Sequence, residues 1–301
     1  MKKIIMAILC GILAAGIGFA AVGCGGGGSD SEYTINVGAG GSGAGISQTH
    51  SGAIDMGMAS SKVEGEDAEG IEVYAICQDG IAVVVNKANT IENLTLAQLK
   101  DIYTGKITTW EAAGSTSVTG TILIGAREEG SGTRDAFLEL IGVEDESTLA
   151  TASIEAISTG SLRDYVAGQA NAIGYVSLGS ITDAVRATKI EGVEATTDNV
   201  LNETYQLARP FNVMYQQSRM DSNDLMQDFF KFLQSQQAHD IIVEAGYVSD
   251  LSTAPEYTVP ETLPTTMTLD IAGSTSVQPL MVTLSEAYVA LLNAELNSSA
   301  E

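Results

Sequence analysis

Three short loops combine glycine with serine or threonine, each directly after an apolar segment and directly before a helical one. They read GGSGAG at residues 40–45, GSGT at 130–133 and GSTSV at 273–277. The first N–H groups of a helix have no partner within the helix and carry the positive end of its dipole. Hydroxyl groups add donors, so such a loop can bind an oxyanion. Serine and threonine are also ordinary helix caps, so one loop is weak evidence and three are stronger.

Arg127 adds a charged donor three residues before Gly130. A guanidinium can hold an oxyanion with two parallel hydrogen bonds. Glu128 and Glu129 follow directly and could fix its position. The alternative is that Arg127 forms only a surface ion pair. Together with the three loops, Arg127 predicts a binding site for a small anion.

A dinucleotide site is a rival hypothesis. Gly38, Gly40 and Gly43 match the G-x-G-x-x-G fingerprint between a strand and a helix. That fingerprint requires an acidic residue roughly 20 positions on, at the end of the next strand, where it binds the ribose. Ser60 and Ser61 stand there instead, so the sequence argues against a nicotinamide cofactor.

Signals for catalysis or for a metal are weak. His50 and His239 are the only histidines, and each lies in a polar helical stretch. No His–Cys or His–Glu cluster offers metal ligands. No serine lies in G-x-S-x-G or beside an obvious base. We therefore expect no enzyme, no catalytic residue, no metal and no cofactor.

The composition is that of an acidic globular protein. The chain has 301 residues, of which 45% are hydrophobic, enough for two modest domains. Its net charge of −24 argues against nucleic acid and against an acidic lipid surface as partners, because both need basic patches. A small anion stays possible, since local dipoles govern its site and distant charge is screened over roughly 8–10 Å.

The first 24 residues are typical of a targeting signal. Two lysines precede an apolar segment at 4–19, and small residues lead into Cys24. This pattern resembles a bacterial lipoprotein signal, in which the cysteine becomes the lipid-carrying N-terminus. An ordinary signal peptide with an incidental cysteine is the alternative. Residues 25–32, a glycine run followed by polar residues, read as a flexible tether.

Strands and helices alternate along the rest of the chain, which predicts an α/β fold with largely parallel sheets. Residues 250–266 hold three of the five prolines and read as an extended linker. A strand at 268–272 and a helix from about Pro279 follow it. Further expected strands lie at 33–37, 53–60, 73–77, 80–86, 121–126, 172–179 and 209–215, and further helices near 95–105, 132–142 and 222–247.

Several long motifs resemble one family. LTLAQLKDIYTGKITTW, AREEGSGTRDAF, AIGYVSLGS and DIAGSTSVQPLM are similar to the phosphate-binding proteins of bacterial Pst ABC transporters. The similarity covers nearly everything after Glu32 except the linker. It implies a two-domain periplasmic-binding-protein fold, with a hinge of crossing strands and an anion in the interdomain cleft. The expected domains are domain I at 33–83 and 210–301, including the linker, and domain II at 84–209.

The resemblance also implies a function and a site. The protein would be lipid-anchored on the extracytoplasmic face of the cell membrane and would deliver inorganic phosphate to an ABC permease. A phosphate sensor or scaffold without transport is the alternative. Carried over position by position, the family's phosphate contacts fall on Thr275, Ser276, Ser42, Ser60, Arg127, Ser131, Gly132 and Thr133.

Two features depart from the family. Some members have an aspartate at the position of Ser60, where it accepts the proton of phosphate and repels sulfate, which has none. A serine oxygen can accept that proton but carries no charge. The second departure is the motif order, since GSTSV stands first in the family but at 273–277 here. The chain therefore reads as circularly permuted, and we expect strand 268–272 to pack beside strand 33–37, preferably within a monomer.

Overall fold

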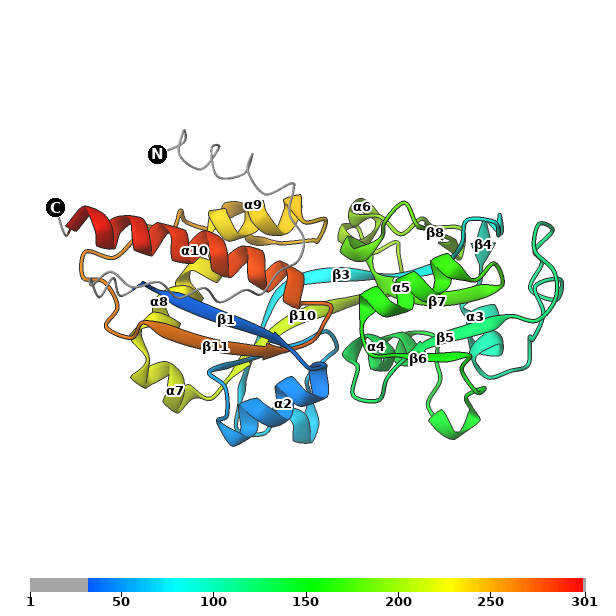
Figure 1. Cartoon of the computed structure of the whole chain (residues 1–301), viewed down its shortest axis with the longest axis horizontal. Helices are drawn as coiled ribbons and strands as arrows, with labels where there is room; N and C mark the ends of the chain where they lie inside the picture. The colour runs from blue at the N-terminus through cyan, green and yellow to red at the C-terminus, as the bar shows by residue number, and fades with distance from the viewer. Residues whose placement is uncertain (1–31, 300–301) are drawn as a thin grey trace, which may run out of the picture. The chain divides into compact units, whose positions relative to one another are not determined.

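The computed structural model describes residues 32–299, and within them strands and helices alternate as expected (Figure 1). Cys24 and nearly all of the expected tether lie outside the described residues. The strands are β1 (Thr34–Ala39), β2 (Met56–Ala59), β3 (Glu72–Asn86), β4 (Asn93–Leu94), β5 (Leu123–Arg127), β6 (Ile154–Ala156), β7 (Ala172–Ser177), β8 (Val185–Ala187), β9 (Lys189–Ile190), β10 (Ala208–Tyr215) and β11 (Thr268–Gly273).

The helices of the described residues follow the strands and cover the sheet. Most are preceded by a serine, threonine or asparagine whose side chain accepts a hydrogen bond from an early backbone N–H of the helix, as expected for these cap residues. They are α2 (Ser42–Ser51), α3 (Leu96–Tyr103), α4 (Gly132–Leu140), α5 (Thr159–Gly168), α6 (Thr197–Leu201), α7 (Gln217–Ser222), α8 (Asp224–Leu233), α9 (Gln236–Glu244) and α10 (Gln278–Ser299).

A nine-stranded sheet runs through residues 32–299 in the order β1-β11-β2-β10-β3-β7-β5-β6, with β8 also paired to β3. Neighbours among β1, β11 and β2 are parallel, as are β5 with β6 and β5 with β7. The antiparallel pairs all involve β3 or β10. We call the part around β1, β11 and β2 the first lobe, and the part around β7, β5 and β6 the second lobe.

The strands β3 and β10 join the two lobes, and Figure 1 shows them running from one half into the other. The sequence predicted two strands at 73–77 and 80–86, but β3 is one continuous strand of 15 residues. Its first half pairs with β10 and its second half with β7. Because each half finds a partner, the strand continues through Gln78 and Asp79, which the prediction left outside both strands.

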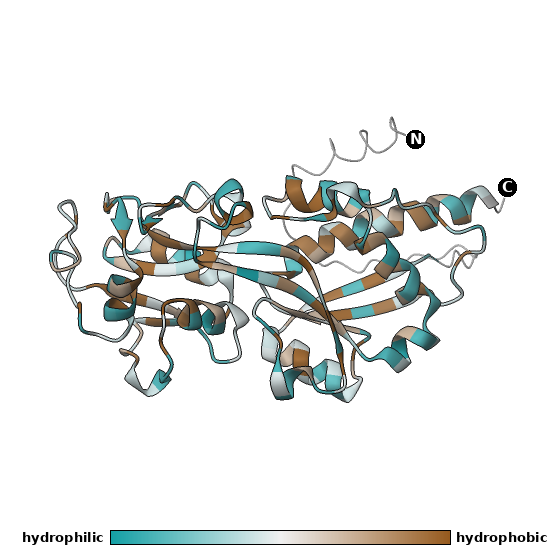
Figure 2. Ribbon diagram, turned by 180° about the vertical axis from the view of Figure 1, so that it is seen from behind, coloured by the Kyte–Doolittle hydropathy of each residue, from teal (hydrophilic) through white to brown (hydrophobic). Residues whose placement is uncertain are grey.

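Each lobe has its own apolar core. Figure 2 shows apolar residues along the strands and on the helices that pack against them. In the first lobe, Phe211, Phe229 and Tyr288 are buried together with residues of β11 and α10. In the second lobe, Trp110 and Phe137 belong to a separate buried cluster. Burial of this apolar surface is the main driving force that shapes each lobe.

The last strand of the chain lies inside the sheet of the first lobe. β11 pairs in parallel with β1 over six positions, from Thr34 opposite Thr268 to Ala39 opposite Gly273, and with β2 on its other side. Figure 1 shows blue β1 and orange β11 side by side there, although they stand near opposite ends of the chain. This confirms the prediction that strand 268–272 packs beside strand 33–37.

The proline-rich segment 250–266 is fixed to the same lobe. The Tyr33 hydroxyl donates to the carbonyl oxygen of Pro264 at 2.6 Å. The carboxylate of Asp224, at the start of α8, accepts from the backbone N–H groups of Thr265 and Thr266. The predicted linker is therefore a docked strap that leads directly into β11. Among the described residues, no helix is both long and apolar enough to cross a membrane.

Candidate functional site

Arg127 stands at the end of β5 and is buried, with only 2% of its surface exposed. Its Nε and Nη2 atoms donate to the two carboxylate oxygens of Glu128, each at 2.7 Å. Nε also donates to the carbonyl oxygen of Ala156. The alternative of a mere surface ion pair is wrong, because the guanidinium is fixed in the interior. Of the two glutamates considered, Glu128 fixes its position.

The other edge of the guanidinium faces hydroxyl groups. Nη2 donates to Thr275 Oγ1 and Nη1 donates to Thr159 Oγ1, each at 3.0 Å. Thr275 lies in the loop between β11 and α10 of the first lobe, whereas Arg127 belongs to the second lobe. The arginine therefore connects the two lobes directly.

Two more hydroxyl groups extend this contact. Ser276 Oγ lies 2.8 Å from Thr133 Oγ1 and 2.8 Å from Thr159 Oγ1. All three side chains are buried, with 0%, 1% and 4% exposed. They come from the start of α10, α4 and α5 respectively. Because hydroxyl groups both donate and accept, this cluster can turn its protons toward a bound anion.

A second set of hydroxyl groups lies in the first lobe. Ser42 Oγ accepts from the backbone N–H of Ser60 at 3.1 Å, and Ser60 Oγ accepts from Ser274 Oγ at 2.8 Å. Ser42 begins α2, and Ser274 precedes α10. All three residues are buried, with at most 2% of their surface exposed. Ser60 thus occupies a polar interior position after β2, beside the N-termini of two helices.

The loop at 130–133 closes against α2. Gly132 begins α4, and a Cβ atom there would lie only 2.4 Å from Ser42 Oγ. Glycine is therefore required for the close approach of the two helix N-termini. The backbone N–H of Gly43 donates to the carbonyl oxygen of Gly130 at 3.0 Å. Ser131 caps α4 by accepting from the Arg134 N–H, and its own proton stays available for donation.

The structure thus brings the eight predicted residues to one place, where the loops of both lobes meet. As phosphate contacts they stay predictions. Reasoning from the sequence missed Ser274 and Thr159. Ser274 lies inside the quoted GSTSV loop, but the resemblance carried over only its two following neighbours. Thr159 lies in the stretch STGS at 158–161, which repeats the strand, small hydroxyl and helix pattern and was overlooked.

A buried ion pair supports the site from the hinge. Nε and Nη2 of Arg209 donate to Asp79 Oδ2, and Arg209 Nη1 donates to the carbonyl oxygen of Ser60 at 2.9 Å. Ser177 Oγ and the Leu178 N–H donate to Asp79 Oδ1. Burial raises the pKa of Asp79 and lowers the pKa of Arg209, while each charge opposes the shift of the other. The pair joins β3, β10 and β7 and holds the backbone of Ser60.

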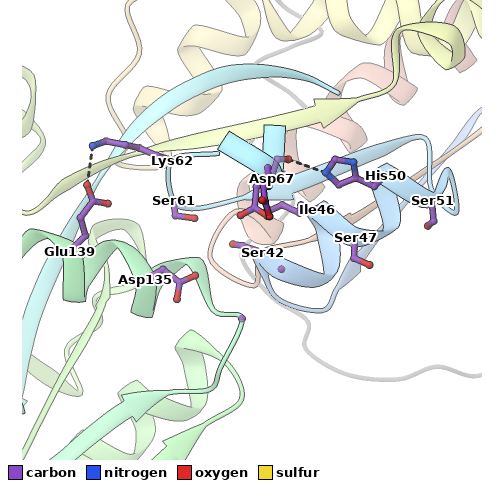
Figure 3. A pocket seen from close by; sticks show the side chains of 13 residues that line it. Ser42, Ile46, Ser47, His50, Ser51, Ser61, Lys62, Asp67, Asp135 and Glu139 are labelled. Atoms are coloured by element: carbon purple, nitrogen blue, oxygen red, sulfur yellow. Dashed lines mark hydrogen bonds and ion pairs between the residues drawn. The ribbon is translucent and has the colours of Figure 1, made fainter. Parts of the chain in front are cut away.

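A pocket of about 990 Å³ lies at the mouth of the site (Figure 3). Asp135 of α4 faces Ser61 and Ser42 across it. The Asp135 side chain is partly open to solvent, yet withdrawal from water by the pocket walls raises its pKa to about 6. Lys62 and Glu139 form an ion pair at 3.0 Å between the lobes, but both are 58% exposed, so it contributes little.

Comparison with known proteins identifies the family. The model of the PBP superfamily domain matches residues 28–237. The chain belongs to the PBP superfamily. It is 40% identical to phosphate-binding protein PstS 2 of Streptococcus pneumoniae over 184 residues, which cover 59% of this chain and 61% of that protein. It is 30% identical to phosphate-binding protein PstS of Bacillus subtilis, with 67% of each chain covered.

Solved structures agree with this assignment. A putative phosphate ABC transporter substrate-binding protein of Clostridium perfringens with bound phosphate is 39% identical, with a TM-score of 0.66 over 69% of this chain and 84% of that chain. An ABC-type phosphate transport receptor of Vibrio cholerae is 35% identical, with a TM-score of 0.59 over 69% and 85%. The expected fold and the resemblance to Pst phosphate-binding proteins are confirmed. The chain spans about three fifths of the length of the pneumococcal relative, and the circular permutation stays a prediction.

The hinge ion pair generates a stability prediction. Asp79→Asn should lower the free energy of unfolding by about 3–5 kcal/mol, because the charge of Arg209 is then buried without its partner. Lys62→Ala removes the exposed ion pair with Glu139 and should cost less than about 1 kcal/mol. Urea unfolding of both variants measures the difference. Equal effects would contradict the structural role of the buried pair.

Proposed function

We propose that the protein is a solute-binding protein that captures inorganic phosphate outside the cytoplasm and delivers it to an ABC permease. The observation that carries this proposal is the buried Arg127, whose guanidinium faces hydroxyl groups of both lobes. The names of the relatives, phosphate-binding proteins and a phosphate transporter's binding protein, support the same ligand.

The hydrogen-bond donors of the candidate site match the acceptor oxygens of phosphate. A tetrahedral dianion offers several acceptor oxygens and no large apolar surface. The guanidinium can supply charge-assisted hydrogen bonds, and the N-termini of α2, α4 and α10 supply backbone N–H groups and positive dipole ends. The hydroxyl groups of Ser276, Thr133 and Ser42 complete the set. Because water is largely excluded, each of these bonds counts for more than it does in solution.

Closure of the lobes would couple binding to a change of state. The Arg127–Thr275 and Thr133–Ser276 hydrogen bonds join the second lobe to the first. An anion held by both lobes makes contacts that exist only when the lobes are together, so it favours the closed state by the free energy of those contacts. The continuous strands β3 and β10 are the segments about which such a hinge movement would turn.

Binding, not turnover, is the proposed role. Among the residues that the structure describes, no group of three or more His, Cys, Asp or Glu side chains is placed to hold a metal. The ring of His50 points to the carbonyl oxygen of Asp67 in the mouth pocket, on the exposed side of α2 (Figure 3). The acidic groups nearest to Arg127 and Arg209 are engaged with those arginines.

Attachment to the membrane is part of the proposal. Cys24 follows an apolar segment and small residues, the pattern of a lipoprotein signal. We expect Cys24→Ala to move the protein from the membrane fraction to the soluble extracytoplasmic fraction, because the lipid is its proposed anchor. Cell fractionation with immunoblotting measures this, and Cys77→Ala is the control, since that thiol is buried in the core. Membrane retention of the Cys24 variant would contradict the anchor.

Arg127→Ala should weaken phosphate binding by at least about 2 kcal/mol, since a hydrogen bond to a charged group is worth roughly 1.5–3 kcal/mol. The unchanged protein should bind one phosphate in the micromolar range or tighter, about −8 kcal/mol. Isothermal titration calorimetry measures both. Arg163→Ala is the matched control, because Arg163 also lies in the second lobe and also pairs with the next residue, Asp164.

Circular dichroism has to show that both arginine variants are folded. If the Arg127→Ala protein is folded and binds phosphate as tightly as the unchanged protein, Arg127 is not part of the phosphate site. Heat with sulfate or molybdate but none with phosphate would overturn the assignment of the ligand.

Ser60→Asp should sharpen the preference for phosphate over sulfate. Ser60 is buried beside Ser42 and Ser274, and a carboxylate there would accept the proton of phosphate but repel sulfate. Calorimetric competition between the two anions measures the ratio of affinities. Ser47→Asp adds the same charge at the exposed mouth and should leave the ratio unchanged. Equal ratios in both variants would show that position 60 does not contact the anion.

A further inference from the structure

The first turn of α5 repeats the geometry of the three predicted loops. The short strand β6 ends at Ala156, and Ser158 and Thr159 lead into the helix. Thr159, the first residue of α5, is 4% exposed. Its hydroxyl contacts Arg127 Nη1 and Ser276 Oγ, both of which are predicted phosphate contacts. The helix N-terminus is therefore directed at the same point as those of α4 and α10.

The Thr159 hydroxyl is not needed to begin the helix. Ser158 is the cap: its side chain accepts from the Ser161 N–H at 3.1 Å, and the Ser161 side chain accepts from the Ser158 N–H at 3.1 Å. This reciprocal capping box satisfies the start of α5. The N–H groups of Thr159 and Gly160 come before the first intrahelical hydrogen bond and face outward. A capping function thus does not explain the buried hydroxyl.

The direction of the hydrogen bond fixes what Thr159 can offer. A guanidinium only donates, so Thr159 Oγ1 accepts from Arg127 and keeps its own proton for donation. Thr159 Oγ1 lies 2.8 Å from Ser276 Oγ, a contact in which either hydroxyl can be the donor. A hydroxyl that accepts from a cation is a stronger donor, since the two bonds polarise each other. The hydrogen bond from Arg127 therefore strengthens the hydrogen bond that Thr159 can donate to an anion oxygen.

The charges at the site are nearly balanced, which makes an additional hydrogen-bond donor such as Thr159 important for binding an anion. Both carboxylate oxygens of Glu128 accept from Arg127 at 2.7 Å, so the single arginine at the hydroxyl cluster is already paired. Arg209 is likewise paired, through two hydrogen bonds to Asp79 Oδ2. The site therefore has little net positive charge with which to hold a dianion. Hydrogen-bond donors and helix dipoles have to supply the remainder, and a fourth helix N-terminus is one of them.

We propose that Ser158–Gly160 form a fourth oxyanion-binding loop, in which Thr159 donates its hydroxyl proton to the bound phosphate. This inference rests on the proposed phosphate-binding function and adds a residue and a helix to it. The same loop makes Thr159 a determinant of anion choice: because its oxygen already accepts from Arg127, it meets the anion as a donor and favours a phosphate oxygen without a proton, while the proton of phosphate faces Ser60.

The test compares three variants by calorimetry with inorganic phosphate. Thr159→Val keeps the shape but removes the hydroxyl, and phosphate binding should weaken at least tenfold. Thr159→Ser restores the hydroxyl and should bind within about threefold of the unchanged protein. Thr197→Val is the matched control, because Thr197 is likewise the first residue of a helix, behind the cap Thr196 of α6, and makes no contact with the hydroxyl cluster. It should bind as the unchanged protein does.

The outcomes separate this inference from the function on which it rests. If the unchanged protein binds phosphate and Arg127→Ala does not, while Thr159→Val binds normally, the fourth loop is wrong and the function stands. If the unchanged protein binds no phosphate, the function itself fails. Should Thr159→Val not fold, a crystal structure of the unchanged protein with phosphate decides: Thr159 Oγ1 within hydrogen-bond distance of a phosphate oxygen supports the loop, and a greater separation overturns it.

Discussion

The burial of one arginine is the constraint on which the rest of the site depends. A guanidinium in the protein interior needs partners for all of its N–H groups, because an unpaired buried charge is costly. Glu128 occupies one edge of Arg127, and the other edge has to find acceptors on two further segments, at Thr159 and Thr275. Those acceptors are hydroxyls at helix starts, so the arginine gathers the N-termini of α5 and α10. The same groups that satisfy the cation are the donors that an anion requires.

The hinge is built on the same principle. Asp79 and Arg209 lie 130 residues apart in the sequence, yet they pair where β3 and β10 pass between the lobes. Arg209 also holds the carbonyl oxygen of Ser60. The crossing strands are thereby connected to a residue of the site, so a movement of the hinge would shift the backbone of Ser60. Buried pairs of this kind add little net stability, because desolvation offsets their attraction, but they fix the geometry in which both partners are satisfied.

What the sequence revealed follows from how local each signal is. The loops at 40–45, 130–133 and 273–277 were found because a strand, small residues and a helix stand together in the chain. The β6 strand has only three residues, too few for a periodic pattern, so the loop that carries Thr159 was missed. The pairing of Asp79 with Arg209 depends on the fold and has no local signature. The two strands expected at 73–77 and 80–86 form one strand, because the partners that support β3 through Gln78 and Asp79 are distant in sequence and leave no local signal.

The position of β11 shows that the site depends on strand neighbours, not on chain order. β11 lies between β1 and β2, and its following loop supplies Ser274, Thr275 and Ser276. A parallel strand can enter a sheet from any point of the chain, provided that the connection reaches. Here the connection is the strap at 250–266, which is held against α8 and Tyr33. Because the strap is docked along its own lobe, the ordering cost of bringing β11 back is offset by local contacts. We therefore expect β11 to insert within its own molecule and not into a neighbouring one, since the docked strap holds the strand beside its place in the sheet.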